Sequence, residues 1–217
     1  MYDNILFDLD GTLTDPAEGI INSILHSLTY FPEITAPSRE FLQKFIGPPL
    51  AGSYMKYFGM DADTADIAVE KYREYFRPTG IFENKLYDGI KELLENLKAS
   101  GRKVVLATSK PEVFAIQILE HFGLMGYFDV VCGSILDGTR VKKSDVIAYV
   151  LEQNPEFTAE NTIMVGDTEF DILGAGENGL RAIGVQYGYG SGVELAAAGA
   201  FMVVKTVGEL SDILMRL

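Results

Sequence analysis

Hydrophobic residues follow two different patterns along this chain. Short continuous apolar runs, such as Ile5-Leu6-Phe7 near the start, are typical of buried strands, whereas apolar residues spaced by three and four are typical of amphipathic helices. From about residue 15 to 81 only the helical spacing occurs, and beyond residue 82 strand and helix patterns alternate. The predicted strands cover residues 4–8, 103–108, 129–133, 162–167, 181–185 and 200–204.

This alternation predicts the fold class. Continuous apolar strands separated by helices indicate a parallel sheet that is covered by helices on both faces. We therefore predict a doubly wound, Rossmann-like α/β core formed by residues 1–14 and 82–217. The helical segment 15–81 is predicted to be a separate domain, inserted directly after the first strand.

Composition and charge narrow the class of protein. A chain of 217 residues, 47% of them hydrophobic, can bury a substantial core as one domain with an insertion. The net charge of -13 argues against nucleic acid or an anionic membrane as partner, because both require clustered Lys and Arg. The N-terminus lacks a signal-peptide pattern and no apolar run is long enough to span a membrane, so we expect a cytoplasmic protein. The single cysteine, Cys132, is expected to be a buried packing residue.

Polar residues gather where the predicted strands end. Asp8 and Asp10 follow the first strand, Thr108 and Ser109 end the second, and Asp167 ends the fourth. In open α/β sheets the carboxyl ends of the strands form one edge, and ligands bind there. We therefore expect these side chains to converge on one edge of the sheet.

Three carboxylates on one edge would need a cation. Each aspartate taken singly could be an ordinary cap of a turn or helix, but together they repel one another and raise each other's pKa unless positive charge neutralises them. Mg2+ accepts one or two carboxylates and keeps water or phosphate oxygens as its other ligands. The pattern therefore predicts a Mg2+ site that accepts an anionic ligand.

The motifs DLDGT (8–12) and GDTEFD (166–171) enclose a strand ending at Thr108 or Ser109 and a later lysine. In this order they resemble the motifs of the haloacid dehalogenase superfamily, and they span almost the whole chain. The helical insertion is similar to the C1-type cap of the phosphoglycolate-phosphatase-like branch. This resemblance implies a Mg2+-dependent phosphatase that hydrolyses a small phosphorylated metabolite through an aspartyl-phosphate intermediate.

The resemblance also implies a role for each residue at the strand ends. Asp8 would attack phosphorus, and Asp10 would protonate the leaving oxygen and then deprotonate the hydrolytic water. The side chains of Asp8 and Asp167, with the backbone carbonyl of Asp10, would hold Mg2+. Thr108 and Ser109 would bind the phosphoryl oxygens, helped by the N-terminus of the helix that follows.

A lysine would neutralise charge on the phosphoryl group and on Asp8. In the run TRVKKSD, Lys143 is the favoured residue and Lys142 the alternative; the proline that often follows this lysine in the family is absent. Asp171 lies one helical turn beyond the GD pair and would orient the lysine or metal-bound waters. Lys110 is expected to line the entrance of the site or to be solvated.

Other features carry weaker signals. Gly47, in a rigid Gly-Pro-Pro turn of the insertion, is a candidate substrate contact, with a simple helix break as the alternative. The glycine-rich run 184–195 lacks a Walker pattern and is predicted to be a loop near the edge of the site. His26 and His121 are expected to be packing or surface residues.

Several activities remain compatible with this pattern. Phosphoglycolate, a nucleoside monophosphate (making the chain a 5'-nucleotidase) and a sugar phosphate are all possible substrates. A mutase would need an aspartyl phosphate protected from water, and a carbon–halogen hydrolase would not need Asp10. A non-catalytic receiver-like module is disfavoured by the large insertion and by Asp10.

Overall fold

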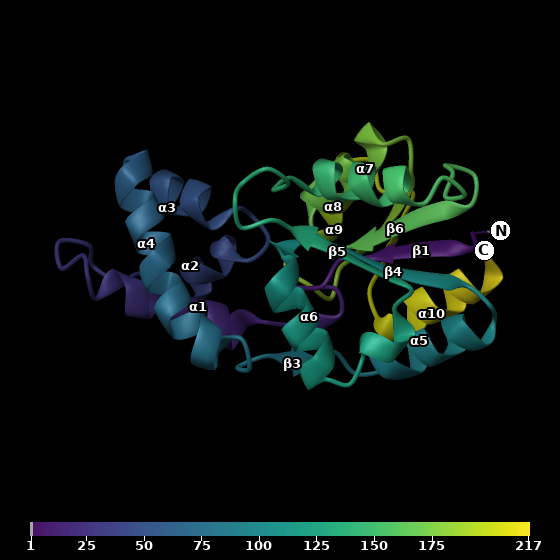
Figure 1. The fold of residues 1–217 in the computed structure, drawn as a ribbon, viewed down its shortest axis with the longest axis horizontal. Coiled ribbons are helices and arrows are strands. Elements are labelled where there is room, and N and C mark those ends of the chain that lie inside the picture. Colours follow the sequence, from purple (N-terminus) through teal and green to yellow (C-terminus); the bar gives the residue numbers. More distant parts are fainter. Residues whose placement is uncertain (1) are drawn as a thin grey trace. The chain divides into compact units, whose positions relative to one another are not determined.

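The computed structural model describes residues 2–217 and contains a six-stranded sheet in the order β5-β4-β1-β6-β7-β8 (Figure 1). Every neighbouring pair in this sheet is parallel. The strands are β1 (Asn4–Phe7), β4 (Lys103–Pro111), β5 (Val130–Ser134), β6 (Thr162–Gly166), β7 (Arg181–Val185) and β8 (Met202–Val204). The predicted doubly wound α/β fold is confirmed, because the order runs outward in both directions from β1.

Strand β1 lies in the middle of the sheet, and its residues Ile5, Leu6 and Phe7 are fully buried. Phe7 pairs with Leu106 of β4 on one side and with Val165 of β6 on the other. This register places the ends of β1 and β6 at the same level of the sheet, beside Leu106 of the longer strand β4. The residues that follow these ends therefore share one edge.

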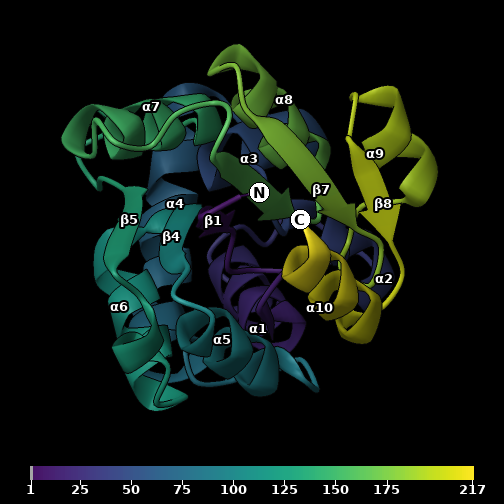
Figure 2. The same ribbon diagram turned by 90° about the vertical axis from the view of Figure 1, so that its right-hand side faces the viewer.

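Helices cover both faces of the sheet (Figure 2). One face carries α7 (Lys143–Gln153), α8 (Glu169–Glu177) and α9 (Gly192–Ala197), and the other carries α5 (Ile90–Ala99), α6 (Glu112–His121) and α10 (Val207–Arg216). A short 3-10 turn, η3 (Met125–Tyr127), precedes β5. Cys132 lies in the core beneath α7, and burial raises the pKa of its thiol to about 11, so it packs as a neutral side chain as expected.

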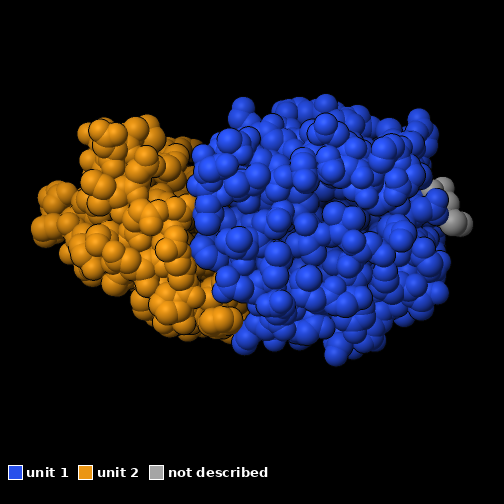
Figure 3. All heavy atoms as spheres, in the orientation of Figure 1, with its two compact units in different colours: residues 1–14, 86–217 blue, residues 15–85 orange. Residues whose placement is uncertain are grey.

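The chain divides into two compact units, residues 1–14 with 86–217 and residues 15–85 (Figure 3). The second unit contains α1 (Ala17–Leu28), α2 (Arg39–Leu42), η1 (Gln43–Phe45), α3 (Leu50–Phe58), α4 (Ala62–Tyr75) and a π-helical turn, η2 (Phe76–Gly80). Ile24, Tyr54 and Ala65 from three of these helices are fully buried, so the unit has its own apolar centre. The short strands β2 (Thr14–Asp15) and β3 (Lys85–Leu86) pair in a separate two-stranded sheet where the chain leaves the first unit and returns. Within residues 2–217, no helix is long and apolar enough to cross a bilayer.

Candidate active site

The chain turns sharply just beyond β1, after the buried Asp8. Gly11 has a φ of 83°, a left-handed conformation that costs glycine little. A Cβ at Gly11 would also lie 2.0 Å from Oδ2 of Asp167. This glycine therefore provides both the turn and the space that the Asp167 carboxylate occupies.

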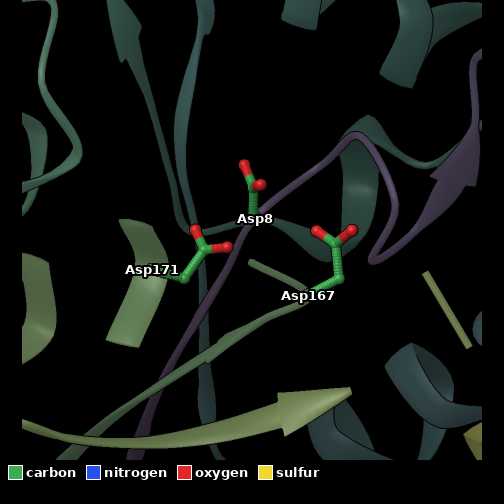
Figure 4. Close-up of side chains that lie close together, drawn as sticks. All are labelled: Asp8, Asp167 and Asp171. Atoms are coloured by element: carbon green, nitrogen blue, oxygen red, sulfur yellow. The ribbon is translucent and has the colours of Figure 1, made fainter. Parts of the chain in front are cut away.

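Three carboxylates come together at this edge of the sheet (Figure 4). Asp8 follows β1, Asp167 follows β6, and Asp171 lies in the first turn of α8. One carboxylate oxygen of each lies within 4.8 Å of the others, and all three residues are buried. The predicted convergence of Asp8 and Asp167 is therefore present in the structure, with Asp171 beside them.

Lys143 is the cation inside this cluster. Its Nζ lies 2.6 Å from Oδ1 of Asp8 and 2.7 Å from Oδ1 of Asp171, and it donates to the carbonyl oxygen of Ala107 at 3.0 Å. Burial works to lower the pKa of Lys143, but the carboxylates of Asp171 and Asp8 outweigh burial and raise it. Lys142 is exposed at the N-terminal boundary of α7, so of the two lysines the structure places Lys143 in the cluster.

Asp171 has a structural role as well as its contact with Lys143. Its Oδ2 accepts hydrogen bonds from the backbone N–H of Thr168 at 3.0 Å and from the Thr168 hydroxyl at 2.9 Å. These bonds cap the N-terminus of α8. One oxygen of Asp171 thus caps the helix while the other contacts Lys143.

Asp167 is covered by the loop that contains Tyr187 to Gly190. The backbone N–H of Tyr189 donates to Oδ2 of Asp167 at 2.9 Å, and the N–H of Gly190 donates to the Asp167 carbonyl at 3.1 Å. Burial, together with the charges of Asp171 and Asp8, raises the pKa of Asp167 well above its usual value. The glycine-rich loop expected near the edge of the site thus packs directly on a site carboxylate.

The other residues predicted for the site have different surroundings. Thr108 is buried at an irregularity in β4, where the pairing with β5 shifts between Ala107 and Pro111, and Ser109 is half-buried. Such bulges are frequent beside active sites, because they re-aim side chains. Gly47 belongs to the other unit, where it is exposed with a φ of 101°, and its substrate contact stays a prediction.

Lys110 corrects one expectation from the sequence. Its side chain is 6% exposed, and its Nζ donates to Oδ2 of Asp10 at 2.5 Å, so it is not solvated. Burial raises the pKa of Asp10 above its usual value, while Lys110 acts in the opposite direction. The contact depends on the irregular end of β4, where the pairing with β5 shifts between Ala107 and Pro111, and the spacing of the sequence does not report it.

The charges of the site favour a bound cation. Asp8, Asp10, Asp167 and Asp171 supply four carboxylates, and the ion pairs at this edge supply two ammonium groups, those of Lys110 and Lys143. Burial is the main cause of the raised pKa of Asp167, and the neighbouring charges of Asp171 and Asp8 raise it further. A hard divalent ion with oxygen ligands fits this donor set.

A doubly wound sheet that gathers carboxylates and a buried lysine at its carboxyl edge defines an α/β protein with an acidic site that could hold a cation. The sequence profile of the haloacid dehalogenase-like hydrolase family matches residues 5–185, and the chain belongs to this family. The resemblance inferred from the motifs is therefore confirmed.

Known relatives narrow the class further. A 5'-nucleotidase of Pseudomonas aeruginosa is 48% identical over 196 residues, which cover 90% of this chain and 88% of that protein. A phosphoglycolate phosphatase of Vibrio parahaemolyticus is 29% identical over 218 residues, which cover 96% and 94%. The crystal structure of a predicted phosphatase from Clostridium acetobutylicum superimposes with a TM-score of 0.95 at 50% identity and covers 100% of both chains. The chain is thus a phosphatase of this family.

Proposed function

We propose that the protein is a Mg2+-dependent phosphomonoesterase that forms an aspartyl phosphate on Asp8. The observation that carries this proposal is the ion pair of 2.6 Å between Lys143 and Asp8 inside the buried acidic cluster. An anionic nucleophile reaches an anionic phosphate only where positive charge offsets their repulsion. Lys143 supplies such charge at the attacking carboxylate.

Each residue has a step in this reaction. An Asp8 oxygen forms a bond to phosphorus, the bond from phosphorus to the leaving oxygen breaks, and Asp10 gives that oxygen a proton. Asp10 then accepts a proton from water, which attacks phosphorus and releases inorganic phosphate from Asp8. Thr108 and Ser109 bind the phosphoryl oxygens throughout, and Asp171 holds Lys143 in place.

The side chains of Asp8 and Asp167, with the backbone carbonyl of Asp10, would hold Mg2+. When bound, Mg2+ supplies positive charge that offsets the carboxylates and the phosphate. Tyr189 and Thr12 fix the Asp167 carboxylate through hydrogen bonds of 2.9 and 3.3 Å, so this carboxylate is oriented by the protein itself. Such fixed second partners support metal affinity.

We propose a nucleoside 5'-monophosphate as the substrate class, with phosphoglycolate as the second candidate. The 48% identity with a 5'-nucleotidase, against 29% with a phosphoglycolate phosphatase, supports this order. The helical unit would act as a cap that selects the leaving group, with Gly47 in a turn that contacts substrate. The presence of Asp10 disfavours a carbon–halogen hydrolase, because that reaction does not need the acid and base that hydrolysis of a phosphate ester requires.

Phosphate release from a panel of esters tests the proposal. The panel contains nucleoside 5'-monophosphates, phosphoglycolate, sugar phosphates and 4-nitrophenyl phosphate, each assayed with Mg2+ and with a chelator. We expect turnover only with Mg2+, with kcat/KM highest for a nucleoside monophosphate. Full activity in chelator would contradict the metal site, and a maximum at phosphoglycolate would reverse the substrate order.

The nucleophile is tested by Asp8→Asn, which keeps the size of the side chain and removes its charge. We expect a loss of at least about a thousandfold in kcat, because the covalent step requires the carboxylate. Mass spectrometry of the rapidly quenched wild-type enzyme should detect a phosphate adduct at Asp8. Wild-type turnover by Asp8→Asn would exclude Asp8 as nucleophile.

A further inference from the structure

Asp10 has a lysine partner of its own. Nζ of Lys110 lies 2.5 Å from Oδ2 of Asp10, and the two side chains are 6% and 13% exposed. The other lysine of the site, Lys143, is occupied by Asp8, Asp171 and the Ala107 carbonyl. The two aspartates of the DLDGT motif are therefore paired with different cations.

Lys110 is held in place by the irregular end of β4. The backbone N–H of Lys110 donates to Oγ1 of Thr108 at 3.2 Å. On the side of β5, the Lys110 carbonyl lies so close to Gly133 that a Cβ there would be only 2.6 Å away. The backbone that carries the lysine is thus held by local contacts, and its ammonium group is placed by the ion pair with Asp10.

This contact distinguishes the two oxygens of Asp10. An ammonium group can only donate, so Oδ2 must be the acceptor in the pair with Lys110. When Asp10 carries a proton, the proton therefore lies on Oδ1. Among residues 2–217, no group hydrogen-bonds to this buried Oδ1 atom. Its hydrogen-bonding capacity is therefore not used by these residues.

We propose that Lys110 is a positioning residue that fixes the Asp10 carboxyl group and keeps its proton on Oδ1, toward the leaving oxygen. The proposal rests on the proposed function, in which Asp10 is the acid for the leaving group. In that step the Asp8–phosphorus bond forms, the bond to the leaving oxygen breaks, and the proton passes from Oδ1 to that oxygen. Lys110 keeps its own protons and bonds throughout.

The dependence of the rate on the leaving group tests this role. An alkyl oxygen must be protonated as it departs, whereas 4-nitrophenolate departs without a proton. We therefore compare kcat/KM, which reports the first chemical step, for 4-nitrophenyl phosphate and for the alkyl ester of the panel that the wild type hydrolyses fastest. In Lys110→Met, kcat/KM should fall roughly ten- to a hundredfold on the alkyl ester and less than about threefold on the aryl ester. The loss on the alkyl ester is part of what a general acid usually contributes.

Two variants serve as references. Asp10→Asn should show the same preference for the aryl ester in a stronger form, because the acid itself is lost. Lys103→Met removes an exposed lysine from the other end of the same strand and should leave both rates within about twofold of wild type. Lys110→Arg, which keeps a charged donor, should narrow the gap between the two esters.

The outcomes separate this proposal from the proposed function. If Lys110→Met loses kcat/KM equally on both esters, the ratio of the two values is unchanged. That outcome would assign the lysine to phosphate binding or to folding and would overturn the proposal. A gap in Lys110→Arg as wide as in Lys110→Met would also overturn it. If Asp10→Asn loses both esters equally, or if Asp8→Asn stays active, the proposed function itself fails. Should Lys110→Met not fold, Lys110→Gln is assayed in its place against the same expectations.

Discussion

At the scale of single residues, the site is compact because glycines lie against its aspartates. A Cβ at Gly11, Gly166 or Gly188 would lie between 2.0 and 2.5 Å from a carboxylate atom of Asp167 or Asp171. At such separations atoms overlap. The backbone at these three positions can therefore lie against the two aspartates only because the residues are glycines. The backbone N–H of Tyr189 reaches Asp167 because its neighbour is a glycine.

Gly188→Ala should therefore weaken Mg2+ binding. The new methyl group would push the loop away from Asp167, with a cost of about 1–3 kcal/mol in the free energy of unfolding, as for other overpacked sites. Thermal unfolding with increasing Mg2+ measures both effects. Gly176→Ala is the matched control, since a Cβ there meets nothing within 4 Å, and helix propensity should make it neutral or slightly stabilising. Equal Mg2+ responses in the two variants would contradict this role of the loop.

The adjacent lysines should differ sharply in their effect on catalysis. Lys143→Ala removes the buried partner of Asp8 and Asp171 and leaves their charges uncompensated, so we expect kcat/KM to fall by at least about a hundredfold. Lys142→Ala removes an exposed side chain and should stay within about threefold of wild type. Steady-state kinetics on the fastest ester make the comparison. A larger loss in Lys142→Ala would reverse the assignment.

The sequence anticipated much of the site at this scale, but not all of it. Asp8 and Asp167 could be placed together because strand ends in a parallel sheet share an edge. The contact of Lys110 with Asp10 depends on the irregular end of β4, which extends to Pro111 instead of ending at residue 108. Hydrophobic patterns do not report such bulges, since a bulge changes the pairing of a strand and not its composition.

At the scale of elements, buried carboxylates gather at the ends of β1 and β6 and in the first turn of α8. The pKa values of Asp167 and Asp171 are raised by burial above their usual values. The folded chain therefore holds these protons more tightly than the unfolded chain does. Their contribution to stability is complete below the ordinary carboxyl pKa of about 3.9 and is lost as pH rises through the raised values.

Mg2+ should consequently stabilise the protein more at high pH than at low pH. Protons and the cation compete for the same carboxylates, and the protons depart as pH rises. We expect the increase in Tm on adding Mg2+ to be larger at pH 8 than at pH 5. Asp167→Asn, as the control, should show little increase at either pH. An increase of the same size at both pH values in the wild type would contradict this account.

At the scale of the whole molecule, the chain forms two units with separate apolar centres. The end of the helical segment was predicted at residue 81, whereas the compact unit extends to Lys85. The Pro-Thr-Gly run in η2 looks like the end of a helix, and β3 has only two residues, which is too short for a periodic pattern. Strong hydrophobic periodicity predicted the order of the longer elements, but segments as short as β3 have no periodic pattern.

The helical unit should be removable. Because β2 and β3 are paired, a flexible linker of about five residues can join their ends in place of residues 16–84. We expect the shortened protein to fold, to respond to Mg2+ in thermal unfolding and to hydrolyse 4-nitrophenyl phosphate, while its selectivity among alkyl esters collapses. Circular dichroism and the ester panel measure these properties. Unchanged selectivity would show that the helical unit does not choose the substrate.

The central position of β1 also has a consequence for synthesis on the ribosome. Its neighbours in the sheet, β4 and β6, are translated long after it, and Val165, which pairs with Phe7, follows roughly 160 residues later. At 5–20 residues per second this interval lasts roughly 8–30 s. Until Leu106 of β4 is made, roughly 100 residues or about 5–20 s after Phe7, this apolar strand has neither partner, while the helical unit encoded between β1 and β4 can already collapse. A chaperone that shields nascent apolar strands should therefore raise the yield of this protein.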